Sequence, residues 1–147
     1  MDVKIRKIER GQPETVAIFC YEVDDRVKEI ADFVRSRQGQ LSGSLDGDEY
    51  AVPIADVYYI ESVDDHSFLY CESKVYEAKQ RLYELEQLLT AKRFLRVSKS
   101  VLLNLMKVES IKPAMNGRFS ALLKNGEQVI ISRKYVPMLR ETLREGS

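Results

Sequence analysis

The chain has 147 residues, enough for one ordinary domain or for a domain of about 100 residues with a smaller appendage. Its 23 Lys and Arg balance 23 Asp and Glu, so net charge alone does not favour a nucleic-acid partner. The start, MDVKIRKIERG, lacks the apolar core of a signal peptide, and no apolar run approaches the roughly 20 residues that span a bilayer. We therefore expect a cytoplasmic protein.

The charges are distributed unevenly along the chain. Residues 1–40 carry 8 basic and 8 acidic side chains, residues 41–92 carry 4 and 11, and residues 93–147 carry 11 and 4. A basic C-terminal third hints at an anionic partner, although a block of like charges is more often a solvated face.

The two cysteines, Cys20 and Cys71, lie in apolar, strand-like runs without a CxxC pair or a neighbouring cluster of histidines. This pattern predicts buried thiols in a reducing compartment.

The first forty residues have the pattern of a small α/β unit. The segment Val3–Glu9 begins with alternating apolar and charged residues and predicts an exposed edge strand, whereas the apolar segment Thr15–Glu22 predicts an interior strand. A turn at Gly11-Gln12-Pro13 separates them. Asp24 is a suitable N-cap for a helix ending near Gly39, with apolar positions at helical spacing at Val27, Ile30, Ala31 and Val34.

A hairpin follows, with strands Leu41–Asp46 and Tyr50–Pro53 around a turn at Gly47-Asp48. The apolar run before Asp24-Asp25 is similar to the start of a receiver domain, but the chain before Glu49 is about half of the length that a receiver needs. We expect residues 1–46 to form an α/β extension for docking or dimerisation, and residues 47–147 to form a second domain.

The rest of the chain predicts an antiparallel β meander with one inserted helix, Arg81–Leu89, and a short terminal helix, Lys134–Leu143. Asn-Gly pairs at positions 116–117 and 125–126 are strong hairpin signals. The expected strands are Val57–Glu61, Ser67–Glu72, Phe94–Val97, Val101–Leu105, Lys107–Lys112, Arg118–Lys124 and Gln128–Ser132.

The stretch Arg93–Ile111, RFLRVSKSVLLNLMKVESI, contains two of these strands joined by Ser98-Lys99-Ser100. A tight connection there places Lys99 at the end of a rigid pair of strands, where it can contact an anion. The alternative interpretation is a solvated turn without a ligand.

The segment FLRVSKSVLLNL resembles the signature of the LytTR family of bacterial DNA-binding domains. Three further pieces match in the family's order: IADVYYIESVDDHSFLYC, RLYELEQLL and NGEQVIISRKYVPML. The resemblance covers roughly residues 49–143 and departs from the family at Ser98, where most members carry His. It implies layered antiparallel β-sheets with one inserted helix and a short C-terminal helix.

The resemblance also implies a transcription regulator that reads duplex DNA with loops. Arg133 follows a strand at the position where the family presents an Arg to DNA, and a guanidinium can bind guanine O6 and N7 together. Lys99 matches a loop position that contacts bases or phosphates, and the loop of His66 matches one that enters a groove. The remaining candidate DNA contacts are Ser67, Ser98, Arg96, Arg118 and Lys134.

Alternatives exist for several of these residues. Arg96 lies within a strand and can instead pair with Glu61 or Glu109, and His66 can be a solvated loop residue. A β-rich protein-interaction module without DNA binding is the alternative function. With one histidine and no nucleophile or metal-ligand pattern, we expect no enzyme, cofactor, metal or small-molecule substrate.

One such domain covers little DNA, so we expect a homodimer on two half-sites of double-stranded DNA. The resemblance to regulators with short N-terminal extensions further implies a membrane protein that holds the regulator inactive.

Overall fold

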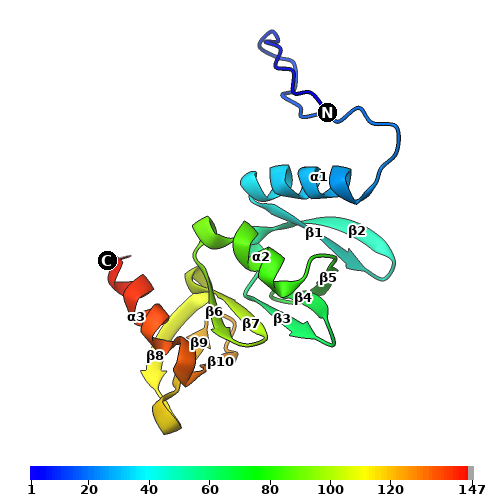
Figure 1. The fold of residues 1–147 in the computed structure, drawn as a ribbon. Coiled ribbons are helices and arrows are strands. Elements are labelled where there is room, and N and C mark those ends of the chain that lie inside the picture. Colours follow the sequence, from blue (N-terminus) through cyan, green and yellow to red (C-terminus); the bar gives the residue numbers. More distant parts are fainter. Residues whose placement is uncertain (146–147) are drawn as a thin grey trace.

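The computed structural model describes residues 1–145 and consists of two antiparallel sheets with three α-helices (Figure 1). The helices are α1 (Asp25–Arg37), α2 (Leu82–Leu88) and α3 (Val136–Glu145). The strands are β1 (Gln40–Leu45), β2 (Asp48–Pro53), β3 (Tyr59–Val63), β4 (His66–Tyr70), β5 (Val75–Ala78), β6 (Phe94–Ser98), β7 (Val101–Asn104), β8 (Val108–Pro113), β9 (Phe119–Leu123) and β10 (Gln128–Ile131).

The larger sheet has seven strands in the order β2-β1-β5-β4-β3-β7-β6, and the smaller has the order β10-β9-β8. Two apolar clusters result from the alternation of side chains along the strands. One lies between the larger sheet and α2 and includes Ile60, Leu69 and Leu85. The other joins the larger sheet to the smaller sheet and α3 and includes Val97, Leu123 and Leu139. The predicted fold class is confirmed.

Asn104, the last residue of β7, connects the two layers. Its side chain is 2% exposed, donates from Nδ2 to the Val57 carbonyl at 2.8 Å, and accepts at Oδ1 from the Met106 amide at 3.0 Å. Val57 precedes β3 in the larger sheet, whereas Met106 leads into β8 of the smaller sheet. One buried amide therefore satisfies main-chain groups on both sides of the junction.

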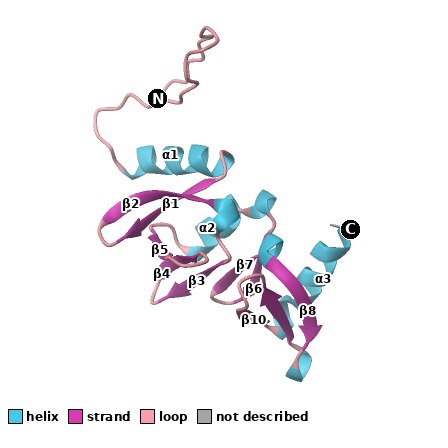
Figure 2. Cartoon of the chain, turned by 180° about the vertical axis from the view of Figure 1, so that it is seen from behind, coloured by secondary structure: helices cyan, strands magenta, loops and turns pink. Residues whose placement is uncertain are grey.

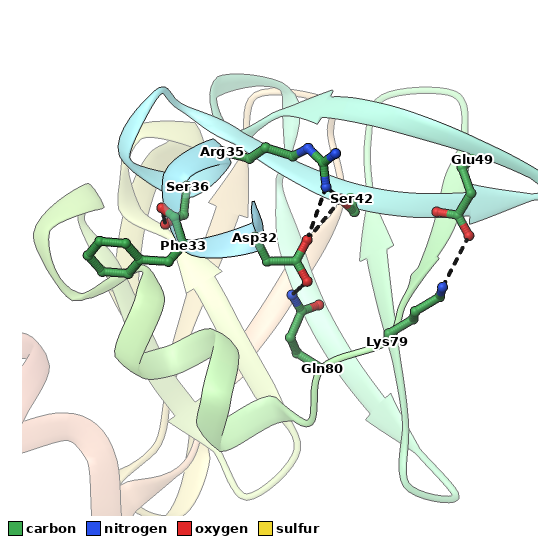
Figure 3. Close-up of polar contacts among 8 residues, drawn as sticks. All are labelled: Asp32, Phe33, Arg35, Ser36, Ser42, Glu49, Lys79 and Gln80. Carbon is green, nitrogen blue, oxygen red and sulfur yellow. Dashed lines mark hydrogen bonds and ion pairs between the residues drawn. The ribbon is translucent and has the colours of Figure 1, made fainter. Parts of the chain in front are cut away.

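Helix α1 begins as predicted, because the Asp24 carboxylate accepts from the Val27 amide at 3.0 Å. Figure 3 shows how it is attached to the sheet. Asp32 accepts from the Ser42 hydroxyl at 3.1 Å and from the Gln80 side-chain amide at 2.9 Å. Arg35 donates to the same Ser42 at 3.2 Å. These polar contacts fix the helix on β1 and beside the end of β5.

The β1–β2 hairpin forms with a turn shifted by one residue from the prediction. Leu45 pairs with Asp48, so the turn residues are Asp46 and Gly47, whose φ angles of 52° and 85° suit a type I′ turn. The expected domain division after residue 46 falls inside this turn. The sheet continues across it, because Ser44 in β1 pairs with Glu77 in β5, a strand that the sequence patterns did not reveal.

The N-terminal strands predicted at Val3–Glu9 and Thr15–Glu22 are wrong. Residues 1–24 contain no strand, although the turn between the two segments forms, with the Gln12 amide donating to the Glu9 carbonyl at 3.3 Å. Figures 1 and 2 show this segment extending away from the sheets. The alternating pattern was present, but a strand also needs a neighbour to pair with, and the rest of the described chain supplies none.

The expectation of two buried thiols is wrong for Cys20, which is exposed on this segment. Cys71 is half-buried, and burial raises the pKa of its thiol to about 11. Among residues 1–145, no helix combines the length and apolar character that crossing a bilayer requires.

Candidate nucleic-acid interface

Two turns that carry candidate residues lie at the same edge of the larger sheet. Strands β3 and β7 are antiparallel neighbours, with Glu61 opposite Val101 and the Ser62 amide donating to the Ser100 carbonyl at 2.8 Å. The C-terminal end of β3 therefore lies beside the N-terminal end of β7. This pairing brings the β3–β4 turn, which precedes His66, next to the β6–β7 turn, which contains Lys99.

The segment between β10 and α3 reaches the same edge. The Ser132 amide donates to the Val97 carbonyl at 2.8 Å, which places Arg133 and Lys134 beside the end of β6 and close to the Lys99 turn. This main-chain hydrogen bond between the two sheets fixes the position of the Ser-Arg step that the sequence singled out.

The β8–β9 connection completes the group. Phe119 at the start of β9 pairs with Ile131 at the end of β10, so the turn before Phe119 lies beside Arg133. Gly117 in this turn has φ of 72°, and a Cβ built on it would lie 2.9 Å from Cδ of Arg133. Glycine suits this position because its backbone is in the left-handed region and because the Arg133 side chain occupies the space that a Cβ would need.

We call these four connections, residues 64–66, 98–100, 114–118 and 132–134, the loop edge. In Figure 1 they lie on the lower side of the molecule, whereas α1 and the N-terminal segment are at the top. The loop edge presents four exposed cations, Lys99, Arg118, Arg133 and Lys134. Within residues 1–145, none of the four forms a salt bridge, although the Lys134 ammonium lies 5.7 Å from the centre of the Tyr135 ring.

The acidic pair in the β3–β4 turn, Asp64 and Asp65, takes positive φ angles of 51° and 64°, which aspartate tolerates better than most residues. Asp65 lies 3.6 Å from the Arg81 guanidinium. His66 is exposed, and its Nδ1 lies 3.0 Å from Oε2 of Glu77. That contact orients the ring and leaves Nε2 for an external partner.

Two serines in the candidate set, Ser67 and Ser98, are turned toward the protein and away from solvent. Ser67 is 1% exposed and faces the interior, because strand alternation turns it away from the side on which His66 lies. The prediction of a DNA contact by Ser67 is therefore wrong. Ser98 is half-buried, and its hydroxyl accepts from the Ser100 amide at 3.3 Å, so it shapes the turn that holds Lys99.

Arg96 is a positioning residue. Its side chain is only 18% exposed and donates from Nη2 to Glu86 at 2.9 Å and from Nη1 to the Lys99 carbonyl at 2.7 Å. The alternative expectation that Arg96 pairs with Glu61 or Glu109 is wrong, because α2 places Glu86 over β6 and Arg96 binds it instead. Bonded in this way, Arg96 connects α2 to the main chain of Lys99 in the β6–β7 turn.

Gly117 and Glu86 were missed as contributors to the site. The Asn-Gly signal at 116–117 announced a turn, but only the packing of the two sheets brings that turn against Arg133. Glu86 is one of several acidic residues in the middle of the chain, and no local pattern distinguishes it.

Comparison with known proteins decides the family. The sequence model described as the LytTr DNA-binding domain matches residues 48–144, about two thirds of the chain. The chain belongs to this family. A solved LytTr DNA-binding domain from Bacillus cereus is 27% identical and superimposes with a TM-score of 0.68, covering 71% of this chain and 96% of its own.

Two kinds of relatives extend this assignment. The sensory transduction protein LytT of Enterococcus faecalis is 31% identical over 94 residues, which cover 64% of this chain and 39% of LytT. A Staphylococcus aureus protein named as an uncharacterized HTH-type transcriptional regulator is 26% identical over 130 residues, 87% of this chain and 88% of that protein. The prediction of a DNA-binding transcription regulator of the LytTR type is confirmed, and the alternative interaction module finds no support in these relatives.

The name of the S. aureus protein refers to a helix-turn-helix, a motif of two helices joined by a short turn. In residues 1–145 of the present LytTr protein, consecutive α-helices are separated by strands. The described residues therefore contain no helix-turn-helix.

Proposed function

We propose that this LytTr protein regulates transcription in the cytoplasm, without catalysing a reaction, by reading duplex DNA with its loop edge. The observation that carries the proposal is the convergence of four connections from two sheets, which brings Lys99, Arg118, Arg133 and Lys134 together without a salt bridge to the rest of residues 1–145. Cations on rigid turns can bind DNA phosphates with little loss of conformational freedom.

The four cations and His66 have different roles in this proposal. Arg133, in contact with Gly117, presents a planar fork to a guanine edge in the major groove. Lys99, a point charge at the turn fixed by Arg96, binds phosphate. Arg118 and Lys134 bind neighbouring phosphates, and His66 offers Nε2 to a groove. Ser98 supports the turn from within.

The test compares Arg133→Ala with Lys99→Ala in a gel-shift assay on promoter duplex at several salt concentrations. Loss of a bidentate base contact should cost about 1–3 kcal/mol of binding free energy and relax specificity at one base pair. Loss of a phosphate contact should weaken all sequences alike and reduce the salt slope by about one unit.

Matched controls are Lys74→Ala in the β4–β5 connection and Lys124→Ala in the β9–β10 connection, exposed cations outside the loop edge and outside residues 1–46. Both controls should bind as the unchanged protein does. If Arg133→Ala and Lys99→Ala also bind normally to the best available duplex, the loop edge is not the DNA interface.

We further propose that two copies bind two half-sites on one face of the duplex, and that residues 1–46 serve dimerisation or docking, including docking to an inhibitory membrane protein. Inserting five base pairs between the half-sites rotates one by about half a helical turn and should abolish cooperative binding. Unchanged binding after the insertion would indicate independent monomers.

A further inference from the structure

The N-terminal arm, defined as residues 1–23, is left uncovered by the rest of its chain. Val3, Ile5 and Phe19 are 89%, 94% and 93% exposed. Within residues 1–145, the main chain of the arm makes hydrogen bonds only to the arm itself: the Gln12 amide donates to the Glu9 carbonyl, and the Pro13 carbonyl accepts from the Thr15 hydroxyl. The arm and Ile30 of α1 line an open hollow. A monomer would expose these apolar side chains to water, at a cost that a partner surface would remove.

The larger sheet has an unpaired edge at β2. This strand pairs with β1 on one side and with no other strand among the described residues. Its outer row of main-chain donors and acceptors is therefore open to another strand, a form of association that proteins use for recognition and otherwise block. Tyr50, in the middle of β2, is 41% exposed and can pack against an added strand.

The charges of the arm and of this edge are complementary. The segment Val3–Arg10 carries Lys4, Arg6, Lys7 and Arg10 against one acidic residue, Glu9. The β2 edge and its turn carry Asp46, Asp48 and Glu49. Glu49 has one cation, Lys79 at 3.8 Å, and both side chains are largely exposed (Figure 3). An arriving basic strand would therefore meet acidic side chains on both faces of β2, because Asp48 and Glu49 point to opposite faces.

We propose that the segment Val3–Arg10 of one copy pairs with the free edge of β2 in a second copy, in a reciprocal dimer. The arm of the same chain leads away from β2 (Figure 1). In a dimer with one two-fold axis, each arm can pair with the β2 edge of the other copy, so both arms and both edges gain a partner. Strands β6 and β7 lie at the far end of the sheet order from β2. The dimer thus leaves both loop edges free to bind two half-sites. Only this binding of two half-sites rests on the proposed function; the pairing of the arm with β2 does not.

The test uses two charge-reversed proteins of full length. The arm variant carries Lys4→Glu, Arg6→Glu and Lys7→Glu, and the edge variant carries Asp48→Lys and Glu49→Lys. A control carries Asp56→Lys and Glu72→Lys, exposed acidic residues that lie outside β2. Masses are measured by sedimentation or light scattering, and circular dichroism checks that each variant is folded.

The unchanged protein and the control should be dimers, and each charge-reversed variant alone should dimerise at least about tenfold more weakly. An equimolar mixture of the two variants should form heterodimers, because the acidic arm then meets the basic edge and the basic arm meets the acidic edge. Arm-to-arm pairing predicts a dimeric edge variant, and pairing of the arm within its own chain predicts monomers throughout; either result overturns the proposal. A dimer that shows this exchange but does not shift DNA would contradict the proposed function alone.

Discussion

Replacing Asn104 by Ala tests whether one buried amide holds the two sheets together. The substitution removes the donor to the Val57 carbonyl at 2.8 Å and the acceptor of the Met106 amide at 3.0 Å, at a residue that is 2% exposed. Water has little access to replace either partner, so both main-chain groups lose a hydrogen bond in a dry environment.

Each group left without a partner costs about 1–3 kcal/mol, so Asn104→Ala should lower the free energy of unfolding by about 2–5 kcal/mol. For a chain of this size, that corresponds to a decrease in Tm of roughly 5–15 °C. Urea unfolding followed by circular dichroism should show a lower midpoint with the slope unchanged. The control Asn125→Ala removes an acceptor from an exposed turn, where water can replace it, and should cost less than about 1 kcal/mol.

Asn104→Asp separates the two hydrogen bonds by pH. A carboxylate keeps the acceptor for Met106 but turns a second acceptor toward the Val57 carbonyl, and burial raises the pKa of the new carboxyl above its unfolded value. The unfolded state then ionises first as pH rises, so the destabilisation should be small near pH 4 and should grow toward pH 7. A destabilisation below about 1 kcal/mol for Asn104→Ala, or one for Asn104→Asp that does not change with pH, would refute this account of the junction.

Three further predictions concern residues around the loop edge and the thiols. Gly117→Ala and Gly126→Ala each place a side chain at positive φ, and each should lower the free energy of unfolding by about 1–2 kcal/mol. Only the new methyl group of Gly117→Ala meets the Arg133 side chain, so only this variant should weaken operator binding in a gel shift. Arg96→Lys keeps the charge, but the lysine cannot reach both Glu86 and the Lys99 carbonyl. The variant should lose about 1–3 kcal/mol of stability and loosen the Lys99 turn. Unchanged urea unfolding would contradict the role of Arg96 in connecting α2 to this turn. Iodoacetamide at pH 8 should modify exposed Cys20 well before Cys71, because the raised pKa of Cys71, about 11, keeps its thiol protonated. The rate of Cys71 modification should increase as the pH approaches that value. Equal rates for the two thiols at pH 8, measured by peptide mass mapping, would contradict this prediction.

Much of the LytTr domain was predictable because its signals are local. The Asn-Gly pairs marked turns, the Asp24 cap marked the start of α1, and the apolar pattern marked the strand Phe94–Val97, which forms as β6. The order of the four matched segments also predicted the family. The turn and cap signals depend on the conformational preference of a few neighbouring residues and need no distant partner.

Tertiary structure alone decided which side chains can reach a ligand. The sequence placed Arg96 on a strand, but its partner Glu86 comes from a helix whose position depends on the whole core. Packing of the sheet buries the face of β4 that carries Ser67 and Leu69 and leaves His66 exposed on the other face. The arm has the alternation of a strand, but strand formation requires hydrogen bonds to a neighbour that its own chain does not place beside it. Pairing and burial are properties of segments distant in sequence, so local patterns specify the elements but not their partners.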